Sequence, residues 1–245
     1  MTSVIPPRQF TWAYGVTTVP ERKDVLLPQT LHSLCDAGFG DPHLFVDGCN
    51  DPSEYTEFGC MVSCRPKPAM SIVGNWVLGM WELYVRNPLA HRYAMFQDDI
   101  QAVGNLREYL EACPYPEPGY LNLMTHETNK KHTRNKPGWC LALQKGLGAT
   151  GLVFDRDTLC AILRSDVLVW KPQAAKNVIA KKKIDGGIAE ATNRLGYKEY
   201  VHNPSLLQHW GINSSVGNHG SRYLPPIESF PGQETDAMDF LQETK

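Results

Sequence analysis

Segments with the pattern of β-strands alternate along this chain with segments of helical periodicity, and this alternation constrains the fold more than any other feature. Residues 10–19 and 93–96 form extended apolar runs. Between them, a helix is predicted over about 71–86, ending before the Asn-Pro pair at 87–88, because apolar side chains recur at helical spacing: Val73, Val77, Met80 and Tyr84. Strands that alternate with helices predict an α/β protein with helices packed on a sheet.

The same patterns place the remaining elements. Further strands are expected at 43–47, 120–125 and 149–154, and further helices from about Pro28 to a stop at Gly38, over 155–165, and from Asp185 to a stop at Gly196. Residues 48–69 carry Pro, Gly and Ser and are expected to be an irregular loop. The tail after Tyr223 is expected to be loosely attached.

Length and composition set outer limits. The chain has 245 residues, of which 42% are hydrophobic and 20% charged, so we expect a globular protein with a sizeable core rather than a disordered one. The net charge of −2 argues against a uniformly basic nucleic-acid-binding protein, although local basic patches remain possible. We find no apolar stretch of about 20 residues and no signal-peptide pattern, and therefore expect a cytoplasmic protein without membrane contact.

The seven cysteines are an odd number and lie in apolar surroundings, which favours reduced thiols. Cys49, Cys60 and Cys64 lie closest together and could form a zinc site with His43. Their spacing lacks a second matched pair, so free thiols are the preferred interpretation.

Acidic side chains follow two of the predicted strands. Asp47 ends one strand, and Asp98 and Asp99 end another. Ligands of open α/β sheets bind beyond the carboxyl ends of the strands, so these acids are expected on one rim. Two adjacent carboxylates raise the cost of ionising each other, so either they cap the next turn or a positive group lies against them. A divalent Mg²⁺ or Mn²⁺ ion would meet the second requirement.

Several short motifs follow one another along the chain in this order: "VTTVPER", "LPQTLHSLCDAGF", "LFVDG", "QDD", "DGG" and "NPSLLQHWGINSS". This order resembles glycosyltransferases of the GT-A fold, which use nucleotide sugars, and the last motif is similar to a segment of the branching N-acetylglucosaminyltransferases. The resemblance spans residues 11 to about 218. It implies a single Rossmann-like GT-A domain over 1–223, with a mixed sheet flanked by helices, followed by a tail over 224–245. It also implies a nucleotide-sugar-binding half over 11–110 and an acceptor-binding half over 111–223.

The resemblance also implies roles for residues of the metal site. Gln97, Asp98 and Asp99 occupy the place of the family's DxD motif. Asp99 would bind Mn²⁺ or Mg²⁺, and Asp98 would contact the ribose or the donor sugar. His209 matches a late metal-binding histidine, although a lone histidine in such a place is more often a packed core residue. Position 97 is usually acidic in the family, so Gln97 is a departure that weakens the ribose contact.

Donor-binding roles follow in the same way. The resemblance implies that Thr18 and Arg22 meet the nucleotide of a UDP-sugar, that Asp47 faces the base, and that Asn75 lies near the donor. Asp185 would be the catalytic base of an inverting transfer, removing the proton of an acceptor hydroxyl. A plain helix N-cap is the alternative interpretation of Asp185.

The acceptor is indicated by two basic stretches, 129–136 and 176–183, the second of which includes Lys181, Lys182 and Lys183. Such runs are commonly solvated faces, but lysines close to the catalytic position suit a polyanionic acceptor. Trp139 could supply a stacking platform. Viral enzymes of this type glycosylate hydroxymethylated pyrimidines in double-stranded DNA, so DNA in a host cytoplasm is the expected acceptor. A saccharide or protein acceptor, an inactive nucleotide- or glycan-binding module, and a metal-dependent hydrolase remain alternatives.

Overall fold

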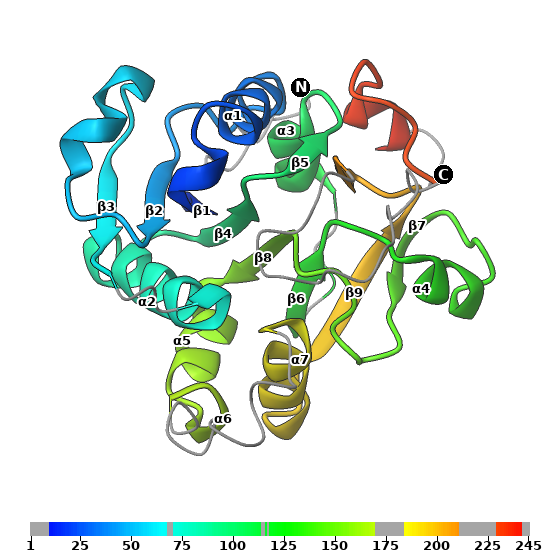
Figure 1. Ribbon diagram of the computed structural model, residues 1–245. Helices are drawn as coiled ribbons and strands as arrows, with labels where there is room; N and C mark the ends of the chain where they lie inside the picture. The colour runs from blue at the N-terminus through cyan, green and yellow to red at the C-terminus, as the bar shows by residue number, and fades with distance from the viewer. Residues whose placement is uncertain are drawn as a thin grey trace, which may run out of the picture.

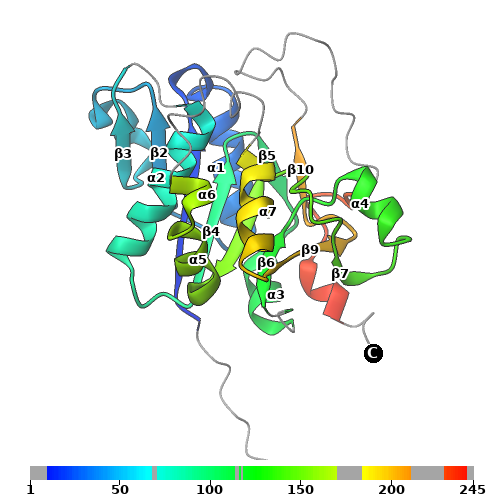
Figure 2. The ribbon, with the colours of Figure 1, turned by 90° about the horizontal axis from the view of Figure 1, so that it is seen from below.

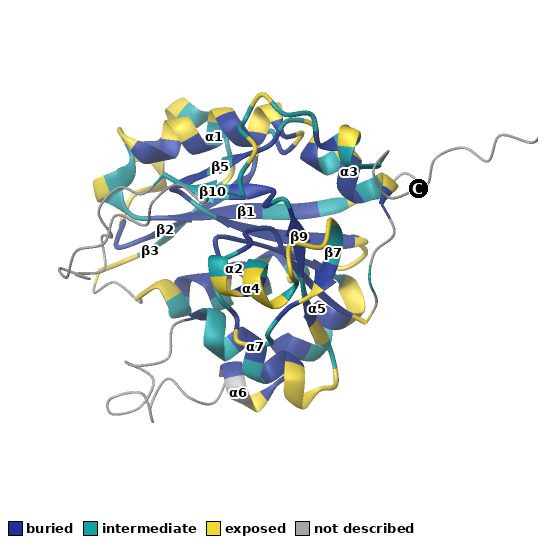
Figure 3. Cartoon of the chain, turned by 90° about the vertical axis from the view of Figure 1, so that its right-hand side faces the viewer, coloured by how far each residue is buried: buried dark blue, intermediate teal, exposed yellow. Residues whose placement is uncertain are grey.

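The computed structural model describes residues 10–67, 71–113, 116, 118–169, 184–210 and 229–241. In these residues the chain forms an eight-stranded sheet with helices on both faces, as Figures 1 and 3 show. The strands lie in the order β3-β2-β1-β4-β8-β6-β9-β7. Their bounds are Trp12–Thr18 (β1), His43–Asp47 (β2), Val62–Arg65 (β3), Arg92–Gln97 (β4), Gly119–Asn122 (β6), Gly138–Leu141 (β7), Gly151–Asp155 (β8) and Lys198–Asn203 (β9). A small antiparallel sheet pairs β5 (Ile100–Ala102) with β10 (Leu207–His209).

The sheet is mixed. Strands β3, β2, β1 and β4 are parallel neighbours, β8 runs antiparallel between β4 and β6, and β9 lies parallel to β6 and antiparallel to β7. Every residue of β2 is buried, as is expected of a strand that is covered on both faces. Because β1, β2 and β4 are parallel, their carboxyl ends meet at one edge of the sheet, where Thr17 pairs with Gln97 and Thr18 with Val46.

Helices α1 (Leu26–Asp36) and α3 (Leu106–Ala112) cover one face of the sheet, and α2 (Ser71–Arg86), α5 (Arg156–Leu163) and α7 (Ile184–Arg194) cover the other (Figure 3). Short α6 (Asp166–Val169) packs against α7, as Figure 2 shows, and α4 (Glu127–His132) lies near β7. The 3₁₀ segments are Pro20–Arg22 (η1), Pro52–Phe58 (η2) and Ala237–Leu241 (η5). Each face of the sheet buries its own apolar cluster.

These observations confirm the α/β class and the mixed sheet flanked by helices. Helix α2 has the predicted bounds, and α1 ends just before Gly38, whose φ of +88° suits glycine. Two expectations were wrong. The segment 48–69 is not a plain loop, because it contains η2 and the edge strand β3.

The tail is also more firmly held than expected over the described residues 229–241. The backbone N–H of Gly104 donates to Thr235 O at 2.9 Å, and the N–H of Ala237 donates to Gly104 O at 2.9 Å. Ala237 is fully buried, and Phe230 and Phe240 pack against the core. The expectation of a loosely attached tail overlooked these apolar anchors.

Within the described part of the chain, no helix is both long and apolar enough to cross a bilayer. All seven cysteines are free thiols. His43 does not face them, because its Nε2 lies 2.8 Å from Ser63 Oγ and 3.8 Å from Glu82 Oε1. The zinc site considered for Cys49, Cys60, Cys64 and His43 is therefore not assembled in this structure.

Candidate active site

A pocket of about 100 Å³ opens at the edge of the sheet where β1, β2 and β4 end. All eight residues predicted for the donor and metal sites line it: Thr18, Arg22, Asp47, Asn75, Gln97, Asp98, Asp99 and His209. They come from η1, α2, the ends of three strands, the turn after β4, and β10. The topology of the parallel sheet therefore brings together residues that are up to 191 positions apart, from Thr18 to His209 (209 − 18 = 191).

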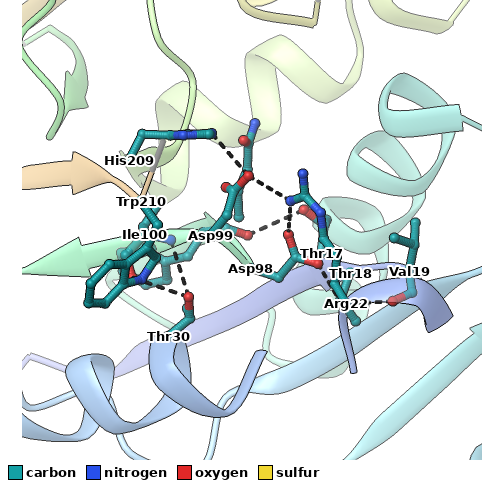
Figure 4. Close-up of polar contacts among 12 residues, drawn as sticks. Thr17, Thr18, Val19, Arg22, Thr30, Asp98, Asp99, Ile100, His209 and Trp210 are labelled. Atoms are coloured by element: carbon teal, nitrogen blue, oxygen red, sulfur yellow. Dashed lines mark hydrogen bonds and ion pairs between the residues drawn. The ribbon is translucent and has the colours of Figure 1, made fainter. Parts of the chain in front are cut away.

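Asp98 and Asp99 share one guanidinium, as Figure 4 shows. Nη1 of Arg22 donates to Asp98 Oδ1 at 2.5 Å and to Asp99 Oδ2 at 2.6 Å. Thr18 Oγ1 donates to the other oxygen of Asp98 at 2.6 Å. Asp98 and Asp99 are only 3% and 1% exposed, so charged carboxylates here require such partners. The acid pair thus has a positive group against it, which favours that prediction over a turn cap.

His209 approaches Asp99 from the opposite side, with Nε2 3.0 Å from Oδ2 (Figure 4). The pairing of β10 with β5 sets His209 opposite Ile100. Trp210 fixes this register, because its backbone N–H donates to Asp99 O and its indole N–H to Ile100 O, each at 2.8 Å. His209 is therefore held against the acid pair rather than packed in the core.

The two carboxylates have different proton affinities. Burial raises the pKa of Asp98 above its ordinary value, although the charge of Arg22 opposes this effect. Burial also acts to raise the pKa of Asp99, but the hydrogen bond and charge of His209 and the charge of Arg22 outweigh it, so that the pKa of Asp99 is lowered. Asp99 is thus the carboxylate that stays ionised most readily.

Three buried polar atoms of the pocket residues have no hydrogen-bond partner: Arg22 Nε, Asn75 Oδ1 and Asp99 Oδ1. The amide nitrogen of Asn75 donates to Phe45 O at 2.8 Å, which turns the side chain so that only its oxygen is left over. Because buried polar groups are nearly always paired, one pocket with three unpaired atoms points to a polar ligand.

A divalent metal ion fits this donor set with two protein ligands. Oδ1 of Asp99 is a free carboxylate oxygen, and His209 offers an imidazole beside the same carboxylate. Both oxygens of Asp98 are already used by Thr18 and Arg22. Among the described residues, no three His, Cys, Asp or Glu side chains converge as a complete ligand set. A cation at Asp99 and His209 would need ligand oxygens and water, an arrangement typical of Mg²⁺ and Mn²⁺.

Asp185 does not line this pocket, but a short stretch of backbone connects the two. Its Oδ2 accepts the backbone N–H of Gly148 at 3.3 Å. Two residues further along, the backbone of Thr150 accepts the N–H of Gln97 at 2.8 Å, and Ala149 O accepts the Gln97 side-chain amide at 3.2 Å. Gln97 lines the pocket, so residues 148–150 connect Asp185 to it. Asp185 is the second residue of α7, and its carboxylate binds this loop, which does not favour a simple N-cap.

Of the predicted acceptor residues, the structure describes only Trp139. Trp139 lies on β7 at the far end of the sheet, where its indole N–H donates to Cys113 Sγ at 3.3 Å and its ring packs edge-on against His202. The ring therefore serves packing here, and its stacking role stays a prediction. Lys181, Lys182 and Lys183 lie outside the described residues.

Sequence reasoning missed other residues of the site. Thr17, Val19 and Ile72 also line the pocket. The signal in the sequence that could have found them is that each lies close to a residue predicted for the site.

Comparisons with known proteins give a fold likeness only. Neither a family model nor a curated protein matches the chain. Among solved structures, one similar chain is assigned as a glucose-1-phosphate thymidylyltransferase from Bacillus anthracis, in complex with sucrose, with 12% identity, a TM-score of 0.45, and coverage of 80% of this chain and 89% of that one. Another is a mannose-1-phosphate geranyltransferase from Thermus thermophilus, with 14% identity, a TM-score of 0.45, and coverage of 78% and 73%.

Proposed function

We propose that this chain is a glycosyltransferase of the GT-A type that transfers a sugar from a nucleoside diphosphate donor, with UDP as the expected nucleotide, to an acceptor hydroxyl. One observation carries the proposal: residues scattered over most of the sequence line one pocket at the carboxyl ends of parallel strands and leave three buried polar atoms unpaired there. A nucleotide with its phosphates would bind at the ends of these strands and supply hydrogen-bond partners for the unpaired atoms.

Two unpaired groups of the pocket residues suit parts of a nucleotide. Arg22 Nε would donate to a phosphate oxygen, and Asn75 Oδ1 would accept a hydrogen bond from a base or a sugar hydroxyl. Asp99 and His209 would hold Mg²⁺ or Mn²⁺, which supplies charge stabilisation of a departing diphosphate. At about 100 Å³ the pocket holds only part of such a donor, so the sugar would extend toward residues 148–150 and Asp185.

Asp185 is proposed as the base. Its carboxylate beside Gly148 would accept the acceptor's hydroxyl proton, so that the oxygen attacks the anomeric carbon as the diphosphate leaves. A single displacement of this kind inverts the configuration. For the acceptor we propose a hydroxymethylpyrimidine in DNA, because exposed basic residues gather at the end of α4 and just after it: Lys131, Arg134 and Lys136. If the protein does not modify DNA, a saccharide or a protein is the alternative acceptor.

The first experiment is a thermal-shift panel of nucleoside diphosphates with and without Mn²⁺. At a concentration of roughly 100 times Kd, a bound nucleotide stabilises by about 2.7 kcal/mol, which is roughly 5–10 °C for a chain of this size. We expect UDP to produce this shift only with Mn²⁺. Asp99→Asn should lose the shift, and the matched control Asp157→Asn, an 86% exposed carboxylate, should keep it. A panel without any metal-dependent shift in the wild type would refute the proposed function.

A further inference from the structure

Glu199 is a buried carboxylate to which no role has been given so far. It lies in β9 and is 1% exposed. Its Oε1 accepts the Asn122 side-chain amide at 3.0 Å, and its Oε2 accepts the backbone N–H of Gly146 at 3.1 Å. Tyr120 also hydrogen-bonds to it, and burial raises the pKa of Glu199 despite these donors. Burying a carboxylate costs free energy unless hydrogen bonds replace those it made to water. The groups that bond to Glu199 therefore show what this buried residue holds in place.

Those hydrogen bonds hold the loop 142–149. The backbone of Glu199 binds it as well, because its N–H donates to Gln144 Oε1 at 2.9 Å and its carbonyl accepts the Gln144 amide at 2.9 Å. The amide of Asn122, already bonded to Glu199, also donates to Leu147 O at 2.9 Å. Gln144 has a positive φ angle of 61°, which is sparsely populated by residues other than glycine, so its neighbours must hold the loop in this conformation.

The loop lies directly against the start of α7. A Cβ atom on Gly146 would stand 1.9 Å from the backbone oxygen of Asp185, and one on Gly148 would stand 2.1 Å from Met124 Cε. A side chain at Gly146 would therefore require the backbone of α7 to move, whereas one at Gly148 would displace the end of the Met124 side chain. In this tight contact, the N–H of Gly148 donates to the carboxylate of Asp185.

The far end of the same loop reaches the donor pocket through Gln97, which bonds to Ala149 O and Thr150 O. We propose that Glu199 is a positioning residue: by fixing Gly146 it sets the path of residues 146–149 and so directs the Asp185 carboxylate toward the pocket. The role of Asp185 in this inference rests on the proposed function. The holding of the loop by Glu199 does not.

Amide hydrogen exchange tests the loop directly. In Glu199→Gln, the new NH₂ group faces donors that a carboxylate accepted, so at least one of those bonds is lost. We expect exchange at Gly146 and Gly148 to rise about tenfold or more, whereas Asp185→Ala should raise exchange at Gly148 alone. Glu199→Asp, which retains the charge but withdraws it from Gly146, serves as the second variant if the glutamine variant does not fold. The matched control is Glu190→Gln, which removes a carboxylate that forms an ion pair with Arg194 in α7. Unchanged exchange at both glycines in a folded Glu199 variant would overturn the inference.

A double-mutant cycle then tests the connection to Asp185, with UDP release from UDP-glucose as the measured rate and UDP with Mn²⁺ as the binding probe. Glu199→Gln should lower the rate at least tenfold and leave the UDP thermal shift unchanged. In an Asp185→Ala background the same substitution should have no further effect. Equal losses in both backgrounds would show that Glu199 does not act through Asp185. A wild type that neither binds UDP nor releases it would refute the proposed function, while the exchange result still decides whether Glu199 holds the loop.

Discussion

Replacing Arg22 by methionine should cost about 3–5 kcal/mol of unfolding free energy at neutral pH, the usual cost of breaking a buried ion pair by removing one partner. The guanidinium is the positive group between two carboxylates that are 3% and 1% exposed. Methionine retains the apolar part of the side chain, so the loss measures the charge and its hydrogen bonds. Both Asp98 and Asp99 would keep their burial and lose a partner.

The deficit should shrink in acid. The charge of Arg22 helps to lower the pKa of Asp99, and a carboxyl with a lowered pKa stabilises the fold above its ordinary pKa and loses that contribution as the pH falls through the folded value. Without Arg22 this contribution is smaller, so wild type and variant differ most near neutral pH. Asp98, whose pKa is raised, protonates first as the pH falls, and Asp99 follows below the ordinary aspartate value of about 3.9, where neither carboxyl needs a counter-ion and the two proteins converge.

Urea unfolding of the two proteins in steps from about pH 7 to below about pH 3 measures both effects. Arg86→Met is the matched control, because Arg86 pairs with Glu82 while its side chain is 51% exposed, and such pairs contribute about 0–1 kcal/mol. If Arg22→Met cost no more than Arg86→Met at neutral pH, the acid pair would not depend on this guanidinium, and the electrostatic account of the pocket would be refuted.

Two further predictions concern the scaffold. Burial lowers the pKa of His202 to about 4, and its Nδ1–H donates to Pro204 O while Nε2 accepts the Tyr109 hydroxyl. The free energy of unfolding should therefore fall between about pH 6.5 and 4 by up to about 3 kcal/mol. In pH-dependent urea titrations His202→Gln should remove this fall, and an unchanged slope would contradict a neutral buried histidine. Asp155→Ala should cost about 1 kcal/mol, because the Asp155 carboxylate caps α5 by accepting the N–H of Thr158 at 2.8 Å; equal midpoints for this variant and wild type in the same assay would contradict the cap.

The donor side of the pocket could be predicted from sequence because its signals are local. Asp47 and Gln97 end strands that have clear apolar runs. The carboxyl ends of neighbouring parallel strands lie at the same edge of a sheet. The partner of the acid pair was not predictable in the same way. Arg22 was expected to meet the nucleotide, whereas its guanidinium lies on Asp98 and Asp99, and only tertiary structure shows how far a long side chain reaches.

The other half of the chain was harder to predict, since β7 and β9 lack the apolar runs that mark β6 and β8. Strand β9 reads "KEYVHN" and β7 reads "GWCL", and neither shows a clean period of two. Glu199 faces inward from β9 only because Asn122, Tyr120 and Gly146 supply donors from elsewhere in the chain. A buried polar network depends on partners distant in sequence, so no local pattern announces it.

The charges of the pocket place a condition on the proposed donor. The three lining carboxylates Asp47, Asp98 and Asp99 and one guanidinium give the pocket a formal excess of two negative charges, before any charge on His209 is counted. A diphosphate adds further negative charge and would compete with Asp98 and Asp99 for Arg22. If Arg22 bonded to the phosphates alone, the two buried carboxylates would lose their counter-ion, which costs about 3–5 kcal/mol of free energy. A divalent cation at Asp99 and His209 offsets that loss and frees the guanidinium. In the proposed function, cation and nucleotide therefore stabilise each other's binding, and by linkage each must raise the affinity of the other by the same factor.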